Sequence, residues 1–249
     1  MVLRAFNAKS SPQLLHSAPI WIDAFDHTTE GLQSLFLRKI LGLPNCVPYA
    51  AICTETGSLL LETRAWFSTF KFWLRLLFNS DQNSLTFSML MDHHASKWLT
   101  VIQKKIISLG ISLDALYLSS ALAIFHSINC RLLDVQLQHL TKAARKTCSP
   151  SHLGLSQNSW LLASYFSHLT DPHLRRAFML ARFNALPSAV LFGRFRGTPY
   201  IHRRCPCSLG AIETVHHVLL DCPFYNSSRA RFLEPLLHDF QDLSNSANV

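Results

Sequence analysis

Three cysteines and a histidine near the C-terminal end of the chain have the types and spacing of metal ligands. Cys205, Cys207, His217 and Cys222 form a C-x-C-x9-H-x4-C pattern. Thiolates and imidazoles are donors that a tetrahedral zinc ion prefers, and four protein ligands are typical of a structural zinc site. The first pair is narrower than the commoner C-x2-C spacing. We therefore predict that these four side chains bind one structural zinc ion.

Two alternatives compete with this ligand set. His216 stands directly beside His217 and is the competing ligand, while His202 is a more distant candidate. The cysteines could also be ordinary buried side chains, which behave as small apolar groups. We favour zinc because a C-P-C triplet is followed so closely by an H-x4-C-P segment.

The first pair of ligands is expected to lie in an extended segment. Pro206 disfavours the helical region for the residue before it, so Cys205 is expected to be extended. In extended chain, residues two apart face the same way. Cys205 and Cys207 can therefore point at one ion.

The second pair is expected at the end of a short helix. His217 and Cys222 are separated by about 140° on an ideal helix of 3.6 residues per turn. They converge only if the helix ends or tightens before Cys222. Pro223 favours such an end, because it disfavours the helical region at the preceding residue.

Arginines are concentrated in the stretch that leads into the cysteines. Between Pro172 and Ile212 there is no acidic residue, but there are seven arginines: Arg175, Arg176, Arg182, Arg194, Arg196, Arg203 and Arg204. Arginine binds phosphate in a bidentate manner and stacks on bases. The alternative is a set of solvated arginines whose stems cover a core. We predict that Arg194, Arg196, Arg203 and Arg204 contact RNA or DNA.

The composition agrees with an anionic partner. The chain of 249 residues has a net charge of +8 and a pI near 9.3. Only 15% of its residues are charged while 49% are hydrophobic, which suggests that another molecule normally covers part of its surface. This supports an alternative function, in which a zinc-stabilised module docks on a polymerase core.

The cysteine content and the N-terminal sequence favour an intracellular protein, in the cytoplasm or the nucleus. Seven cysteines, an odd number, do not form a closed disulfide framework. The first residues have no apolar core of a signal peptide. The most apolar stretch, Ile106–Phe125, contains Asp114, a glycine and several serines, so we interpret it as a turn and a buried helix and predict no membrane contact.

Apolar residues recur at helical spacing along most of the chain, without strand alternation or an internal repeat. We predict an all-α protein, an irregular helical array followed by a small C-terminal zinc-knuckle motif. The predicted domains are a helical region at 1–146, a linker rich in Ser, Pro and Gly at 147–158, and a helical segment at 159–249 with the knuckle at 199–225. Helices are expected at 29–41, 49–57, 58–78, 84–91, 96–108, 113–146, 160–169, 171–184 and 228–240, with Gly42 and Gly57 at the ends of the first two. The helix at 58–78 has Trp66, Phe70, Trp73 and Leu77 on one apolar stripe that is expected to face a core. The region 113–146 is either one long helix or two, with a break near Asn129 and Cys130.

Several segments of the chain resemble LINE-type non-LTR retrotransposon polyproteins. Near the cysteines the similar segments are Arg182–Ala189, Arg204–Cys207, Ile212–Val215, His217–Leu220 and Cys222–Tyr225. Upstream, the segment that follows the reverse-transcriptase core in that family is similar to Phe36–Pro44 and Gly57–Arg64. The resemblance implies a C-terminal zinc knuckle that binds nucleic acid during target-primed reverse transcription. It also implies Cys205, Cys207, His217 and Cys222 as metal ligands, although the C-x-C pair departs from the family's C-x2-C.

The acidic residues do not favour an enzyme. Polymerases hold two metal ions with paired carboxylates, and the chain contains no Asp-Asp pair and no phosphate-binding glycine loop. The resemblance implies that the catalytic palm and endonuclease of such a polyprotein would lie before Met1. We therefore expect a non-catalytic C-terminal piece that binds RNA or DNA and has a reverse-transcriptase core as a second potential partner.

Overall fold

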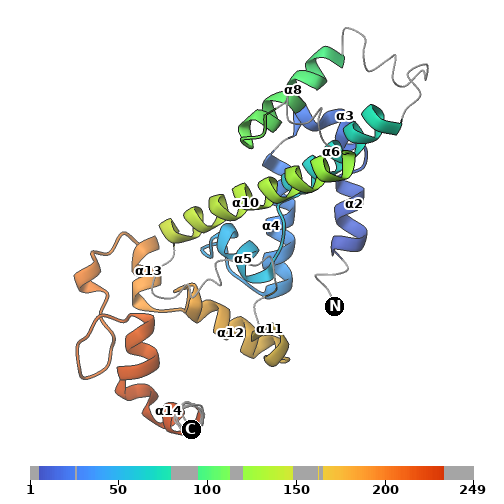
Figure 1. Ribbon diagram of the computed structural model, residues 1–249. Coiled ribbons are helices and arrows are strands. Elements are labelled where there is room, and N and C mark those ends of the chain that lie inside the picture. The colour runs from blue at the N-terminus through green and yellow to red at the C-terminus, as the bar shows by residue number, and fades with distance from the viewer. Residues whose placement is uncertain are drawn as a thin grey trace, which may run out of the picture. The chain divides into compact units, whose positions relative to one another are not determined.

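The computed structural model describes residues 6–25, 27–79, 95–112, 120–147, 162 and 165–232 (Figure 1). Regular structure in these ranges is helical, and their only β pairing is an isolated antiparallel bridge between Arg204 and Ile212. The predicted all-α class is thereby confirmed. The predicted helix at 84–91 lies outside the described residues, as does the part of the last predicted helix beyond residue 232. Of the predicted linker at 147–158, only Thr147 is described, and it belongs to a helix.

The chain divides into two compact units, Met1–Pro172 and His173–Val249. The predicted zinc ligands and the four predicted phosphate-contacting arginines all belong to the second unit. The predicted start of the second domain, at residue 159, lies among residues that the structure does not describe, and that boundary remains a prediction.

The first unit begins with short helical turns and continues with longer helices. The short turns are η1 (Phe6–Ser10), α2 (Ser11–Leu14), α3 (Ala18–Trp21) and η2 (Ile22–Ala24). The others are α4 (His27–Leu41), α5 (Tyr49–Thr56), α6 (Leu61–Asn79), α8 (Ala95–Ser108), α10 (Ala121–Thr147) and α11 (Tyr165–His168). Glycines end α4 and α5 as expected: Gly42 and Gly57 both have positive φ, which costs glycine little.

Helix α6 supplies much of the core of this unit. Its side chains Trp66, Phe70 and Trp73 are buried, as the amphipathic pattern predicts, whereas Leu77 at the end of the same stripe is exposed. They join a cluster that also includes Ile102 and residues of α3, α8 and α10. Helices α3 and α10 both pack on α6.

Helix α10 runs unbroken from Ala121 to Thr147 and packs against both α5 and α6 (Figure 1). A break near Asn129 and Cys130 was one of two sequence-based alternatives for this region, and the continuous helix is the one observed. No helix among the described residues is long and apolar enough to cross a membrane.

A half-buried carboxyl group, that of Glu30, lies at the start of α6. Glu30 accepts hydrogen bonds from the backbone N–H of Glu62 at 2.8 Å and from the hydroxyl of Tyr49 at 2.9 Å. Burial raises the pKa of Glu30 above its usual value, and the hydrogen bonds from Glu62 and Tyr49 act in the opposite direction. The carboxyl group thus links α4, α5 and the first turn of α6.

The second unit consists of short helices and a compact cysteine loop. Its elements are α12 (Pro172–Arg182, which begins at the last residue of the first unit), α13 (Ala189–Phe195), η4 (Tyr200–His202), η5 (His217–Asp221), η6 (Pro223–Tyr225) and α14 (Asn226–Phe232). Three of its buried side chains, Cys205, Cys207 and Cys222, form a cluster of their own. Cysteine is a small side chain, so three of them bury little apolar surface.

Candidate metal centre

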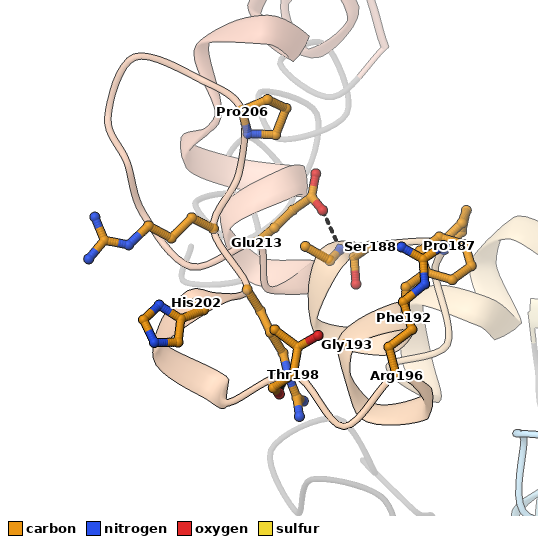
Figure 2. Close-up of a pocket in the computed structure, with 12 residues that line it drawn as sticks. Pro187, Ser188, Phe192, Gly193, Arg196, Thr198, His202, Pro206 and Glu213 are labelled. Carbon is orange, nitrogen blue, oxygen red and sulfur yellow. Dashed lines mark hydrogen bonds between the residues drawn. The ribbon is translucent and has the colours of Figure 1, made fainter.

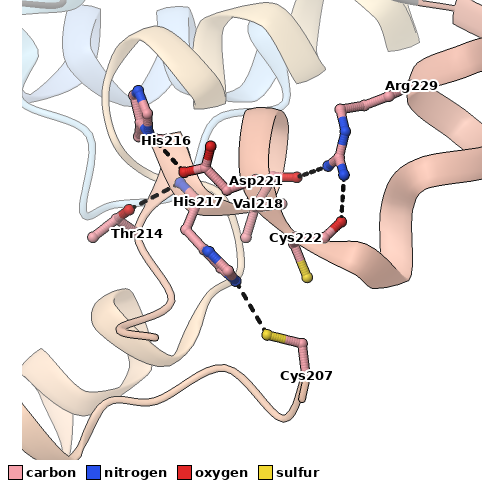
Figure 3. A network of polar contacts seen from close by, with 8 residues as sticks. All are labelled: Cys207, Thr214, His216, His217, Val218, Asp221, Cys222 and Arg229. Carbon is pink, nitrogen blue, oxygen red and sulfur yellow. Dashed lines mark hydrogen bonds and ion pairs between the residues drawn. The ribbon is translucent and has the colours of Figure 1, made fainter. Parts of the chain in front are cut away.

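The four predicted ligands converge on one point. One donor atom from each of Cys205, Cys207, His217 and Cys222 lies within 4.8 Å of the other three, and all four side chains are buried. The Sγ of Cys207 lies 3.4 Å from Nε2 of His217 (Figure 3). The Sγ atoms of Cys205 and Cys222 are 3.6 Å apart. The cysteines are free thiols, because this S···S distance is far longer than a disulfide bond. The group could hold a metal ion.

A narrow loop delivers the first two ligands. The backbone N–H of Cys205 donates to the carbonyl of Ala211 at 2.8 Å, next to the bridge that pairs Arg204 with Ile212. Gly210, with φ of 59°, provides the left-handed turn that closes the loop. The thiols of Cys205 and Cys207 both belong to the buried group, as predicted, whereas the extended conformation of Cys205 stays a prediction.

A single wide turn delivers the other two ligands. The hydroxyl of Thr214 accepts the backbone N–H of His217 at 3.0 Å and so caps the start of the turn. The backbone N–H of Cys222 then bonds to the carbonyl of His217, five residues back, at 2.7 Å, which defines the π-helical turn η5. Of the two alternatives, a helix that ends or one that tightens before Cys222, the structure shows the first: the turn is wide rather than tight, it ends at Asp221, and Cys222 is extended, as expected from Pro223.

The neighbouring histidines do not join the cluster. His216 is exposed, and its Nδ1 lies 3.2 Å from a carboxylate oxygen of Asp221 (Figure 3). His202 is also exposed, on η4. Among the three candidates, only His217 lies in the buried group of potential ligands.

The two cysteines of the loop have opposite pKa shifts. Burial raises the pKa of Cys205 to about 12. Burial acts in the same direction on Cys207, but the backbone N–H groups of Leu209 and Gly210, together with the thiols of Cys205 and Cys222, lower its pKa overall. These neighbours therefore favour the thiolate form of Cys207, and the thiolate is the form that binds metals.

Arg229, which the sequence analysis did not select, holds the end of the wide turn. Its guanidinium donates to the carbonyl of Cys222 at 2.6 Å and to the carbonyl of Val218 at 3.4 Å (Figure 3). It also donates to the side chain of Asn226. The carbonyl of Cys222 also accepts the backbone N–H of Tyr225 at 3.1 Å, so the guanidinium adds a second hydrogen bond there and ties the end of the turn to α14. Arg229 lies seven residues after Cys222 and is part of no sequence motif, so its role could not be recognised from the sequence.

The four predicted arginines differ in their surroundings. Arg194, Arg196 and Arg204 are exposed. Arg203 is instead engaged within the unit, where Nε donates to the carbonyl of Thr198 at 2.8 Å and a terminal nitrogen donates to that of Val190 at 3.2 Å. Arg203 thus has a structural role within the unit, and its predicted contact with RNA or DNA stays a prediction.

Glu213 connects the loop that carries Cys205 and Cys207, called the metal loop from here on, to helix α13. Its backbone N–H bonds to the carbonyl of Arg203 at 2.9 Å, and its carboxylate accepts the backbone N–H of Ala189 in the first turn of α13. A carboxylate at a helix N-terminus is stabilised by the positive end of the helix dipole. Ser188 caps the same turn by accepting the N–H of Leu191. As the first acid after a long basic stretch, Glu213 carried a signal that sequence reasoning could have used.

Comparison of the chain with protein-family models, with curated proteins and with solved structures gives no match. The functional conclusions below therefore rest on the site itself.

Proposed function

We propose that the chain binds nucleic acid through a zinc-stabilised, arginine-rich module in its second unit. The observation that carries this proposal is the convergence of Cys205, Cys207, His217 and Cys222 directly after the arginine-rich stretch. Exposed arginines at fixed positions near a rigid loop are suited to contact phosphates.

Zinc is the ion that these donors favour. Three sulfurs and one imidazole nitrogen match the Cys3His set of structural zinc sites. With Zn–S of about 2.3 Å and Zn–N of about 2.0–2.1 Å, tetrahedral geometry gives S···S edges of ~3.8 Å and S···N edges of ~3.6 Å. The observed separations, 3.6 Å between Cys205 and Cys222 and 3.4 Å between Cys207 and His217, lie close to these values.

The zinc is proposed to be structural. Four protein ligands leave no open coordination position for a substrate or a catalytic water. The cysteine cluster buries little apolar surface, so the ion would supply stability that a hydrophobic core supplies in a larger domain. We accordingly propose no catalytic role for the chain.

The sequence resemblance to LINE-type retrotransposon polyproteins gives this module a context. In that context the chain would be a non-catalytic C-terminal piece that holds RNA or DNA for a reverse transcriptase. The Cys3His convergence is compatible with the knuckle that the resemblance implies.

Metal content and salt-dependent binding test the proposal together. Labelled RNA and DNA strands are titrated with the wild-type chain and with Cys222→Ser at several salt concentrations. Each phosphate contact lowers log K by about 0.7–0.9 per unit of log salt, so affinity should fall steeply as salt rises. Cys222→Ser should lose both metal and binding, whereas Cys130→Ser, which changes an exposed cysteine of α10, should retain both. Salt-insensitive or absent binding by the zinc-loaded chain would contradict the proposal.

A second candidate function is docking on a polymerase core. It is favoured by large apolar side chains on the surface of the first unit, such as Leu122, which is 80% exposed, and Ile20, which is 74% exposed. This candidate predicts stoichiometric binding to a purified reverse-transcriptase domain. Leu122→Ser and Ile20→Ser should weaken that binding while nucleic-acid affinity stays unchanged.

A further inference from the structure

A pocket of about 420 Å³ lies beside the metal loop (Figure 2). Helix α13 forms one side, and the segment that enters the metal loop forms the other. This volume falls within the range of about 300–1,000 Å³ that is usual for pockets that bind small molecules. The lining side chains that matter for its chemistry are Phe192, Arg196, His202, Arg203, Arg204 and Glu213.

One wall of the pocket is fixed by a close contact between two residues. The stem of Arg203 crosses helix α13 at Gly193, where a Cβ atom would lie only 2.6 Å from Cδ of the arginine. The hydrogen bonds of Arg203 to the carbonyls of Thr198 and Val190 hold the stem in this place. The wall is therefore formed without a ligand, which lowers the entropy cost of binding one.

The charge of the pocket favours an anion. Three arginines line it, but only one carboxylate does, that of Glu213. The backbone N–H of Ala189 already donates to this carboxylate, and the adjacent helix terminus offsets part of its charge. Arg196 and Arg204 are exposed and have guanidinium groups that can reach a phosphate.

The pocket also offers an aromatic surface next to a cation. Phe192 is 49% exposed, and the guanidinium carbon of Arg196 lies 6.0 Å from the centre of its ring. An exposed ring beside an arginine is the combination that single-stranded nucleic-acid sites use, with the base on the ring and the cation near the backbone. Phe195, on the same helix, is exposed as well but does not line the pocket.

We propose that this pocket takes one unstacked nucleotide of a single strand, with its base against Phe192 and its phosphate near Arg196 and Arg204. A base inside a duplex is stacked on both faces and cannot enter without being extruded. The module therefore selects single strands or strand ends over continuous duplex. This inference rests on the proposed nucleic-acid-binding function and adds the form of nucleic acid that is preferred.

The first test compares a short labelled single strand with the blunt duplex made from it and its complement, at one salt concentration. We expect the full chain to bind the single strand about tenfold more tightly, which corresponds to ~1.4 kcal/mol and lies within the range for stacking of one base. Phe192→Ala should remove this preference. The matched control Phe195→Ala should keep it.

The second test distinguishes binding in the pocket from a general effect of positive charge. Arg196→Gln and Arg194→Gln each remove one exposed positive charge from α13, but only Arg196 lines the pocket. On duplex, both variants should lose affinity equally. On the single strand, Arg196→Gln should lose several times more affinity than Arg194→Gln.

The outcomes distinguish this inference from the proposed function. If single strand and duplex bind equally and Phe192→Ala changes neither, the pocket inference is overturned while nucleic-acid binding stands. If neither form binds in a salt-dependent manner, the proposed function itself is overturned. Metal content and far-UV circular dichroism check the folding of each variant; should Phe192→Ala fail to load metal, Phe192→Leu, which keeps bulk and removes the aromatic ring, provides the same test.

Discussion

The backbone N–H of Cys222 donates to the carbonyl of His217 at 2.7 Å, and this bond spans five residues rather than the four of an α-helix. On an α-helix these two side chains would diverge by about 140°. The wider π turn brings them to the same side, where both reach the buried group that includes Cys205 and Cys207. The backbone conformation of this one turn therefore decides whether two residues five positions apart can reach the same group.

Replacement of His217 should abolish metal binding, while replacement of its neighbour should not. His217→Ala removes a buried donor of the cluster, and His216→Ala removes an exposed ring that pairs with Asp221. We expect His217→Ala to bind no metal and to unfold the second unit. Elemental analysis of the purified chains measures this difference. A metal-free His216→Ala with a metal-loaded His217→Ala would reverse the ligand assignment.

Arg229→Met should destabilise the metal loop without removing a ligand. The substitution keeps much of the stem and loses the donors to the carbonyls of Cys222 and Val218. Hydrogen bonds from charged groups contribute ~1.5–3 kcal/mol, and we expect a loss of about 2 kcal/mol in the free energy of unfolding. Competition with a chelator should also release the metal faster. Arg194→Met, an exposed change on α13, is the control, and equal metal release from both variants would contradict this role for Arg229.

Two glycine-to-alanine changes should have opposite effects on stability. In Gly193→Ala the new methyl group would collide with the stem of Arg203, and such overpacking costs ~1–3 kcal/mol. In Gly31→Ala, on α4, the new methyl group meets open space, so helix propensity should stabilise the first unit by ~0.5–1 kcal/mol. Hydrogen exchange reports the opening of each unit separately. Unchanged exchange in the second unit of Gly193→Ala would show that Arg203 moves freely.

The half-buried carboxyl group of Glu30 should make the stability of the first unit depend on pH. Burial raises its pKa in the folded chain above the ordinary value of 4.5, so the folded state holds its proton more tightly than the unfolded state does. The resulting stabilisation is complete below pH 4.5 and is lost as the pH rises through the raised pKa.

The comparison with Glu30→Gln isolates this contribution, because glutamine does not titrate. Urea unfolding is followed by the fluorescence of Trp66 and Trp73 in the core of the first unit. The free energy of unfolding of the wild type, relative to Glu30→Gln, should fall with rising pH and then level off. A difference that stays constant or rises with pH would contradict the raised pKa.

Much of the fold could be predicted from local sequence signals. Periodic apolar residues identified the core face of α6, and glycines with positive φ ended α4 and α5. These signals act within one element, so a single sequence carries them. The exposure of Leu77 was not predicted, because the apolar stripe shows which face a side chain is on but not whether another element packs against it.

The four residues of the candidate metal centre could be predicted from residue types and spacing, since the donor set is itself the signal. The backbone conformation that brings them together could not be predicted, because the π turn depends on one backbone hydrogen bond, that between Cys222 and His217. The structural position of Arg203 also escaped prediction, because its acceptors on Thr198 and Val190 are backbone carbonyls, which have no sequence signature. The arginines of this stretch therefore cannot be told apart in the sequence, although Arg203 bonds within the unit and the other predicted ones are exposed.

The metal content of the purified chain, measured by elemental analysis, tests the central claim most directly. The account predicts one zinc ion per wild-type chain and none in Cys222→Ser, with Cys130→Ser retaining the full content. A wild-type chain that folds without metal, or a Cys222→Ser chain that keeps its full zinc content, would contradict the proposal that Cys205, Cys207, His217 and Cys222 hold a structural zinc ion.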